Sequence, residues 1–342
     1  MLTWLGSSAA RAACGSLLEM SDLTVLVLAN PAERQLAMLE QLPPETSIVV
    51  GERVEAFERA APEADVLFNW SGPGDLLRAV FRMCRRVRWV HMRSAGLDGL
   101  LFPELVESAA LLTNATGVFS EPLGEFALAG MLFFAKDLRR MLRNQAAGRW
   151  EQFDIAEITG QTVGIIGYGD IGRAVAARAR AMGMRVLAVK RHALPEGAMD
   201  PYAERIYAPD QIAEMISICD YIAVTAPLTP ETRGLVGERE FAAMQSTAVV
   251  INLGRGPVID EATLLRALTE RRIRGAVLDV FDAEPLPDGH PFYSLDNVLV
   301  SPHCADHTPD WLERAMQFFL DNFELFRKGE TLRNLVDKKL GY

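Results

Sequence analysis

The segment from Thr162 to Gly172, with the sequence TVGIIGYGDIG, constrains the fold of this chain more than any other. An apolar strand here leads directly into three glycines and then into a helical stretch at residues 173–182. The first glycine permits a tight turn, the second lets the backbone approach a pyrophosphate, and the third lets helix and strand pack closely. Free N–H groups at the helix N-terminus would then face the phosphates. The residues expected to contact a dinucleotide here are Gly167, Tyr168, Gly169, Asp170, Ile171 and Gly172.

The end of the next expected strand indicates which dinucleotide is bound. In NAD-binding folds this strand normally ends in Asp or Glu, which accepts hydrogen bonds from the adenosine ribose. Here the sequence is Val189-Lys190-Arg191-His192, without a carboxylate. Lys190 and Arg191 would instead attract a 2′-phosphate. We therefore expect NADP(H) to be preferred, with NAD(H) as the alternative if the two basic residues are only solvated surface.

Short apolar runs alternate with helical stretches in two successive series. The expected strands span residues 23–28, 47–50, 66–68, 89–91 and 111–113, and then 162–167, 185–189, 221–224, 248–252, 275–280 and 298–301. One long helix is expected over 121–143, with Pro122 in its first turn and Gly148 at its end, and another over 309–328. This alternation predicts an α/β protein with two doubly wound parallel-sheet domains.

Composition narrows the possible partners. The 342 residues suit two domains, and a net charge of −10 argues against a general nucleic-acid surface. The four cysteines, at positions 14, 84, 219 and 304, include no Cys-x-x-Cys pair, which favours a reducing compartment and argues against disulfides or a zinc site. No apolar run reaches the length of a membrane span. We therefore expect a cytoplasmic protein without a metal, a nucleic-acid partner or a membrane contact.

Residues 1–20 differ from the rest of the chain. They are rich in Ala and Ser, and Arg11 is the only charged residue before Glu19. Organelle transit peptides are usually richer in arginine, so import is the less favoured interpretation. We interpret the segment as a disordered extension, or as the product of a start codon placed too early, because Met20 leads almost directly into the first expected strand.

Three ionisable residues follow apolar runs further along the chain. Arg255 lies between two glycines after one run, Glu284 lies in the loop after the next, and His303 follows the last. The carboxyl ends of parallel strands meet at one edge of a sheet, where ligands bind in α/β folds. An exposed guanidinium there suits a carboxylate, with a surface salt bridge as the alternative. A carboxylate beside His303 would stabilise its imidazolium form, a general acid able to protonate a carbonyl oxygen.

In order and spacing, these motifs resemble the D-isomer-specific 2-hydroxyacid dehydrogenase family, which includes glyoxylate/hydroxypyruvate reductases. The similarity covers most of the chain from about Leu23 onward. The matching motifs are GIIGYGDIG (164–172), PLTPET (227–232), NLGRG (252–256), LDVFDAEP (278–285) and SPH (301–303).

The resemblance implies a role for each matching residue. Arg255 would bind the substrate carboxylate and polarise its keto group, His303 would donate the proton, and Glu284 would orient and charge that histidine. Asp279 would hold the nicotinamide carboxamide. The substrate-domain loop whose backbone N–H groups face the carboxylate would be Ser94, Ala95 and Gly96. The remaining cofactor-binding residues would be Ala226, Pro227, Thr232, Asn252 and Gly254.

The resemblance also implies a domain organisation. A Rossmann NAD(P)-binding domain of residues 122–304 would be inserted in a discontinuous flavodoxin-like substrate domain of residues 21–121 and 305–342. The two lobes would close over the substrate and exclude water. The helix that begins at Pro122 would serve in a homodimer.

The expected reaction is the NAD(P)-dependent reduction of a small 2-keto acid, such as glyoxylate or hydroxypyruvate, to the D-2-hydroxy acid. Hydride would come from the nicotinamide and the proton from His303. The alternatives are a dehydrogenase for a bulkier 2-hydroxy acid, an enzyme that oxidises formate or a phosphorus oxyanion on the same scaffold, and an NAD(P)H-sensing binding protein of corepressor type.

The substrate is the least constrained part of this prediction. After the histidine the family usually has an apolar residue, Ala and Gly, whereas this chain has Cys304-Ala305-Asp306-His307. Asp306 and His307 would either alter substrate choice or serve local structure, and we favour local structure. A reactive role for Cys304 is not expected, because no base or helix N-terminus is evident. The candidate pocket residues are Asn69, Trp70, Arg93 and Trp311.

Overall fold

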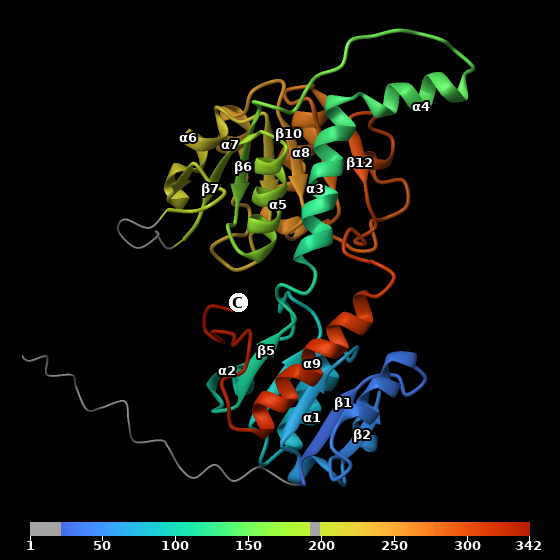
Figure 1. The fold of residues 1–342 in the computed structure, drawn as a ribbon, viewed down its shortest axis with the longest axis vertical. Helices are drawn as coiled ribbons and strands as arrows, with labels where there is room; N and C mark the ends of the chain where they lie inside the picture. The colour runs from blue at the N-terminus through green and yellow to red at the C-terminus, as the bar shows by residue number, and fades with distance from the viewer. Residues whose placement is uncertain (1–21, 192–198) are drawn as a thin grey trace, which may run out of the picture. The chain divides into compact units, whose positions relative to one another are not determined.

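The computed structural model describes residues 22–191 and 199–342, so the predicted extension at residues 1–20 and the predicted strand end at His192 lie outside the described residues. Chain contacts divide the molecule into two compact units (Figure 1). The first comprises the residues up to Arg93, Phe102–Thr113 and Ala315–Val336, and the second comprises Ser94–Leu101, Asn114–Arg314 and Asp337–Tyr342. These junctions differ from the expected bounds at 121 and 304, which remain a prediction about the domains.

The first unit is built on a five-stranded sheet in the order β2-β1-β3-β4-β5. Its strands are β1 (Thr24–Leu28), β2 (Ser47–Gly51), β3 (Val66–Asn69), β4 (Trp89–Met92) and β5 (Leu111–Asn114). β1 pairs in parallel with β2 and β3, and β3 pairs in parallel with β4. This is the strand order of flavodoxin-like sheets, so this half of the predicted fold class is confirmed.

Aromatic stacking holds the last helix of the chain against this sheet. The helices are α1 (Gly74–Met83), α2 (Pro103–Glu107) and α9 (Trp311–Arg327), with 3₁₀ segments at Arg34–Gln41, Val54–Ala56 and Ala61–Glu63. The ring of Phe319 on α9 stacks on Phe68 of β3 with centroids 3.9 Å apart and on Trp89 of β4 at 5.3 Å. All three side chains are fully buried. Since aromatic side chains bury more apolar area than most others, this stack anchors α9 to the sheet.

The second unit is built on a seven-stranded sheet in the order β12-β11-β10-β9-β6-β7-β8. Its strands are β6 (Thr162–Ile166), β7 (Arg185–Val189), β8 (Arg205–Tyr207), β9 (Tyr221–Val224), β10 (Val249–Asn252), β11 (Gly275–Leu278) and β12 (Val298–Val300). All of these pairings are parallel. The chain order reverses beside β6, and ligands bind outside the carboxyl ends of the strands at such a switch point. The Rossmann half of the predicted fold class is therefore confirmed.

The prediction of one long helix over 121–143 is wrong. The structure has two helices, α3 (Ser120–Ala135) and α4 (Leu138–Ala146). They are separated at Asp137, which adopts a left-handed φ of +47° and whose carboxylate accepts a hydrogen bond from the backbone N–H of Arg140. Asp tolerates this conformation and caps helix N-termini, so it restarts the helix in a new direction. Gly148, with φ +61°, follows the end of α4 as expected.

The other helices of the second unit cover the sheet. They are α5 (Asp170–Ala181), α6 (Ile212–Ile216), α7 (Glu238–Ala243) and α8 (Glu261–Thr269). Two glycines let α3 approach its neighbours closely. A Cβ on Gly124 would lie 2.9 Å from the backbone of Ala174 on α5, and one on Gly130 would lie 2.9 Å from the side chain of Val277 on β11. The helix α3 is therefore packed tightly against α5 and β11.

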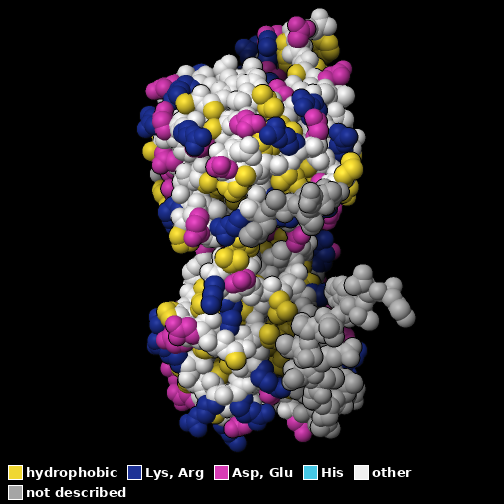
Figure 2. Space-filling view, turned by 90° about the vertical axis from the view of Figure 1, so that its left-hand side faces the viewer, with side chains coloured by type: hydrophobic (Ala, Val, Ile, Leu, Met, Phe, Trp, Pro, Cys, Tyr) yellow, Lys and Arg dark blue, Asp and Glu magenta, His cyan; other side chains and the backbone are white. Residues whose placement is uncertain are grey.

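On the face drawn in Figure 2, Lys and Arg side chains are interspersed with Asp and Glu. No helix within residues 22–191 and 199–342 is long and apolar enough to cross a membrane. Over the same residues, no group of three or more His, Cys, Asp and Glu side chains is arranged to hold a metal ion.

Candidate active site

The glycine turn between β6 and α5 has the geometry that its sequence predicts. Gly167 adopts φ +98°, and a Cβ there would lie 2.4 Å from the backbone N of Ala226. A Cβ on Gly172 would lie 2.4 Å from the carbonyl oxygen of Gly167. A Cβ on Gly169 would meet no protein atom within 4 Å. The first and third glycines are thus required by the protein itself, whereas the second borders open space in front of α5, which fits a pyrophosphate.

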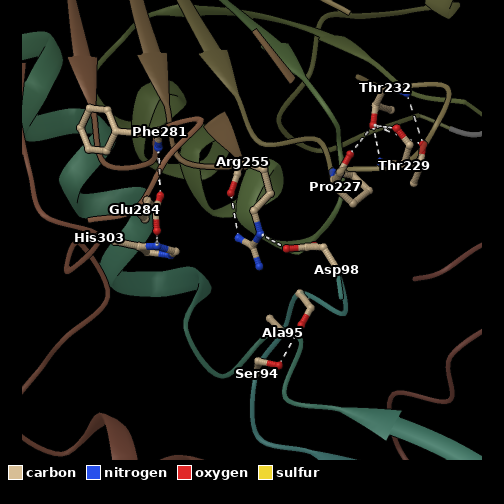
Figure 3. Close-up of polar contacts among 12 residues, drawn as sticks. Ser94, Ala95, Asp98, Pro227, Thr229, Thr232, Arg255, Phe281, Glu284 and His303 are labelled. Carbon is tan, nitrogen blue, oxygen red and sulfur yellow. Dashed lines mark hydrogen bonds and ion pairs between the residues drawn. The ribbon is translucent and has the colours of Figure 1, made fainter. Parts of the chain in front are cut away.

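The extension of β9 lies against this turn. The hydroxyl of Thr225 donates to the carbonyl oxygen of Gly167 over 2.6 Å. The following turn is closed by the hydroxyl of Thr232, which donates to the carbonyl oxygen of Pro227 over 2.6 Å and accepts from the backbone N–H of Thr229 (Figure 3). The structure therefore brings Ala226, Pro227 and Thr232 to the same edge of the sheet as the glycines, while their contact with a cofactor remains a prediction.

A pocket of about 550 Å³ opens beyond the ends of β7 and β8. Its lining residues are Lys190, Arg191, Met199, Asp200, Ala203, Glu204, Arg205, Ile206, Tyr207, Ala208 and Gln211. The end of β7 carries no carboxylate, but Asp200 and Glu204, further along the chain, line the same pocket.

Protein donors already surround the carboxylate of Asp200. One oxygen accepts from the hydroxyl of Tyr168 at 2.6 Å and from the backbone N–H groups of Tyr202 and Ala203 at 2.9 Å, and the other accepts from Arg173 at 2.5 Å. Burial alone would raise the pKa of Asp200, but these hydrogen bonds together lower it to about 2. Burial first, and the hydrogen bond to Asp200 second, raise the pKa of Tyr168. Asp200 is thus a charged anchor for the glycine turn.

The two basic residues at the end of β7 differ in their surroundings. The guanidinium of Arg191 donates to the hydroxyl of Tyr342 over 2.7 Å, lies 5.4 Å from the centroid of that ring, and approaches Glu231 at 3.7 Å. The ammonium group of Lys190 makes no hydrogen bond or ion pair with the described residues and is half-buried in the wall of the pocket. Lys190 is therefore the more available cation of the pair.

Arg255 follows β10 in a turn that its neighbours fix. The side chain of Asn252 donates to the carbonyl oxygen of Arg255 at 3.1 Å and accepts from the backbone N–H of Gly254 at 3.1 Å. A Cβ on Gly254 would lie 2.6 Å from the carbonyl oxygen of Ala226, and one on Gly256 would lie 2.0 Å from the backbone of Phe281. The glycines beside Arg255 are therefore needed because the extensions of β9 and β11 press against the turn.

The loop Ser94–Leu101 lies against the guanidinium of Arg255 (Figure 3). Nε of Arg255 donates to the carboxylate of Asp98 over 2.8 Å, and Nη1 of Arg255 donates to the carbonyl oxygen of Gly254 over 2.8 Å. A Cβ on Gly96 would lie 1.6 Å from Nη2. Asp98 is a charged neighbour of this site that sequence reasoning missed, because nothing local in the sequence pairs it with a residue 157 positions away.

The predicted loop is held in place around this guanidinium. The hydroxyl of Ser94 donates to the carbonyl oxygen of Gly96 over 2.8 Å, and the side chain of Asn114 donates to the carbonyl oxygen of Ala95 over 2.7 Å. Both contacts fix carbonyl groups within the loop. The structure therefore brings Ser94, Ala95 and Gly96 to Arg255, while their role in binding a substrate remains a prediction.

His303 and Glu284 are in direct contact. Nδ1 of His303 lies 2.6 Å from Oε2 of Glu284, and both side chains are partly exposed, at 44% and 34%. The second oxygen of Glu284 accepts from the backbone N–H of Phe281 at 2.9 Å (Figure 3). An ionised carboxylate can only accept hydrogen bonds, so Nδ1 carries the hydrogen in this pair and Nε2 is the atom left for a ligand.

Asp279 organises the turn that carries His303. Its Oδ1 accepts from the hydroxyl of Ser301 at 2.5 Å and from the backbone N–H groups of Cys304 and Ala305 at 3.0 and 3.1 Å. His303, between these contacts, adopts a left-handed φ of +51°. Asp279 itself is buried, at 2% exposure. The contact of Asp279 with the nicotinamide carboxamide remains a prediction. Its hydrogen bonds to the turn that carries His303 were not predicted from the sequence.

The candidate pocket residues fall into two groups. His307 stacks on Trp311 with ring centroids 4.3 Å apart, and its Nε2 lies 3.7 Å from the carboxylate of Asp306. Burial raises the pKa of Asp306. Asn69, Trp70 and Arg93 belong to the first unit, where the guanidinium of Arg93 lies 5.0 Å from the ring centroid of Trp70. Their place in a substrate pocket remains a prediction.

Comparison with known proteins identifies the fold and its relatives. The family description "D-isomer specific 2-hydroxyacid dehydrogenase, NAD binding domain" matches residues 128–305. A glyoxylate reductase of Thermococcus gammatolerans is 34% identical over 270 residues, which are 76% of this chain and 79% of that protein. A D-3-phosphoglycerate dehydrogenase of Methanocaldococcus jannaschii is 30% identical over 92% of this chain, but this chain spans only 59% of that relative's length.

A solved structure agrees with these sequence relatives. An NADPH-dependent glyoxylate/hydroxypyruvate reductase from Sinorhizobium meliloti, in complex with NADP and sulfate, has a TM-score of 0.81. It is 26% identical, and the comparison covers 94% of this chain and 100% of that one. The matched family segment contains the glycine turn, Arg255, Glu284 and His303. This chain therefore belongs to the D-isomer specific 2-hydroxyacid dehydrogenase family and is an oxidoreductase with a nicotinamide-dinucleotide-binding domain.

Proposed function

We propose that this protein reduces a small 2-keto acid to the D-2-hydroxy acid, with glyoxylate and hydroxypyruvate as the first substrates to test. The observation that carries the proposal is the Glu284–His303 hydrogen bond of 2.6 Å at the same sheet edge as Arg255 and the glycine turn. The names of the relatives support the choice of small keto acids, since several are glyoxylate reductases.

Each side chain of the site would have a distinct role in such a reduction. Arg255 would bind the substrate carboxylate with its Nη groups and polarise the keto oxygen, because a guanidinium fork matches a carboxylate in geometry and charge. Nε2 of His303 would donate a proton to the keto oxygen, while Glu284 keeps Nδ1 protonated and the ring oriented. A bound nicotinamide dinucleotide would supply the hydride to the keto carbon.

We further propose that NADPH is preferred to NADH. Lys190 lines the pocket beyond β7 without a partner among the described residues, and a 2′-phosphate would provide one. The carboxylate of Asp200 is occupied by four protein donors, so it is poorly placed to accept hydrogen bonds from ribose hydroxyls. Arg191 would contribute less than Lys190, because Tyr342 and Glu231 already contact it.

The test is an absorbance assay of reduced-nicotinamide oxidation with glyoxylate and hydroxypyruvate, run in parallel with NADPH and NADH. The proposal expects turnover with at least one of the two acids, and a kcat/KM for NADPH at least about tenfold above that for NADH. Cofactor binding without turnover on any 2-keto acid, including bulkier ones, would contradict the enzyme proposal and favour a cofactor-sensing role. Turnover with NADH alone would contradict the cofactor preference.

We also propose that the protein is a homodimer in the cytoplasm. The helix α4 and the segment that follows it extend from the second unit (Figure 1) and expose large apolar side chains, with Leu142 at 61%, Trp150 at 95% and Ile155 at 52%. Exposed apolar side chains gathered on one segment are typical of interfaces. Light scattering is expected to give twice the mass of one chain, and a Leu142→Arg variant is expected to lower that mass. Cell fractionation tests the proposed location in the cytoplasm.

A further inference from the structure

The guanidinium of Arg255 is held on three sides by the protein. Its Nε donates to Oδ2 of Asp98 (Figure 3). Its Nη1 donates to the carbonyl oxygen of Gly254, and its Nη2 lies against the backbone of Gly96. A guanidinium has five N–H donors, so these contacts leave donors free on both Nη atoms. The edge of Arg255 that faces away from Asp98 is thus available for a carboxylate.

We propose that Asp98 is a positioning residue for Arg255, which fixes the plane of the guanidinium so that its Nη edge meets the substrate carboxylate. The inference rests on the proposed role of Arg255 as the carboxylate-binding group. Arginine side chains have many rotamers, and a clamp that must be ordered by the substrate binds more weakly than one already in place. Asp98 would therefore act before the substrate arrives.

Stability alone does not account for this ion pair. The side chains of Arg255 and Asp98 are 27% and 36% exposed, and ion pairs at such exposure contribute little to the free energy of unfolding. Asp98 also reduces the positive charge that an anionic substrate would meet. The Asp98–Arg255 contact weakens the attraction for an anionic substrate and adds little stability. Orientation of the guanidinium accounts for it instead. The arrangement parallels that of His303, whose ring is held by Glu284.

A competing role for Asp98 predicts the opposite kinetics. If its carboxylate occupied the place of the substrate carboxylate, removing it would lower the KM for the keto acid. Asp98 instead contacts Nε, the donor nearest the chain, and does not occupy the Nη donors, one of which binds the carbonyl oxygen of Gly254. Removing Asp98 is therefore expected to raise the KM.

The experiment is a double-mutant cycle with Asp98→Ala, Arg255→Ala and the double variant, measured as kcat, KM for glyoxylate and Kd for NADPH. Asp98→Ala is expected to raise the KM about tenfold, with a smaller change in kcat and none in the Kd for NADPH, because only the clamp is disturbed. Asp98→Asn is expected to restore part of the loss, since the amide oxygen can still accept from Nε. In the Arg255→Ala background, Asp98→Ala is expected to add nothing.

Asp296→Ala is the control for removal of an ion-paired aspartate, since Asp296 pairs with Arg271 on the same unit, with side chains more exposed at 53% and 57%. It is expected to leave KM and kcat unchanged. An unchanged or lowered KM in Asp98→Ala would overturn the inference and leave the role of Arg255 intact, provided that Arg255→Ala is impaired. Additive losses in the double variant would overturn it as well, because Asp98 would then act independently of Arg255. Full activity of Arg255→Ala would overturn the proposed clamp and this inference together.

Discussion

The imidazole of His303 and the carboxylate of Glu284 meet at a hydrogen bond of 2.6 Å, although the two residues come from different loops. Further hydrogen bonds from the protein fix Glu284 and the turn that carries His303. Glu284 accepts the backbone N–H of Phe281 at 2.9 Å, and the turn of His303 is tied down by the buried carboxylate of Asp279. The pair is therefore oriented by the protein itself, which supports the proposed role of His303 as a proton donor.

Replacing Glu284 with Gln is expected to lower kcat about 10- to 100-fold. The reason is that the carboxylate accepts from Nδ1 of His303 and holds the ring with Nε2 toward a ligand, while an amide can also donate to the ring and change its orientation. The check is kcat for keto-acid reduction, with Glu324→Gln on α9 as a control that should match the parent. A kcat in Glu284→Gln equal to that of the parent would refute the coupling.

Replacing Asp279 with Ala is expected to lower kcat and destabilise the protein, because two backbone N–H groups and the hydroxyl of Ser301 lose their acceptor. Leaving buried donors unpaired costs about 1–3 kcal/mol each. Asp279→Asn keeps an acceptor oxygen and should recover most of the thermal stability. Melting temperature and kcat measured on both variants check this, and equal stability of the Ala variant and the parent would contradict it.

Replacing Lys190 with Asp is expected to raise the Kd for NADPH at least about tenfold and to change the Kd for NADH little, since a carboxylate repels a 2′-phosphate and accepts from ribose hydroxyls. Cofactor fluorescence titration gives both constants. Lys328→Asp, an exposed lysine beyond α9, is the control for the charge change itself. An equal rise in the Kd for NADPH and for NADH would mean that Lys190 does not bind the 2′-phosphate.

Replacing His91 with Gln is expected to reduce the acid sensitivity of the fold. Burial lowers the pKa of His91 to about 3, compared with an ordinary value of 6.5. As the pH falls below 6.5 the unfolded chain gains a proton here and the folded chain does not, so stability is lost between pH 6.5 and 3 and is unaffected above 6.5. The loss is at most about 1.4 kcal/mol per pH unit.

Urea unfolding at pH 7.5 and pH 5.0 measures this effect. The parent protein should lose more stability between the two pH values than His91→Gln does. His290→Gln, at a partly buried histidine paired with Glu261, serves as a comparison. The same loss of unfolding free energy between the two pH values in the parent and in His91→Gln would show that His91 is not the source of the acid sensitivity.

The parts of the fold that the sequence predicted are those with strong local patterns. The strands of both sheets are apolar runs because parallel sheets are covered on both faces, and the glycine turn is readable because each glycine has its own steric reason. The short strand at Arg205–Tyr207 was missed because three residues with an exposed arginine give no apolar run. The break at Asp137 was missed because helical periodicity continues on both sides of it.

The parts of the site that the sequence did not predict depend on chain segments that meet only in the folded protein. Asp98 reaches Arg255 across 157 positions, and Asp200 reaches Tyr168 across 32. Neither acid lies in a motif, so nothing marked it in advance. Arg255, Glu284 and His303 were predictable because each follows a parallel strand, directly or in the loop beyond it, and one edge of the sheet gathers them.

The most direct test of the central claim is 2-keto-acid-dependent oxidation of NADPH by the parent protein and by His303→Ala, with NADPH binding measured on both. The account predicts turnover by the parent, a kcat about 10²- to 10⁴-fold lower in His303→Ala, and an unchanged Kd for NADPH. Full turnover by His303→Ala would show that the proton comes from elsewhere and would contradict the account.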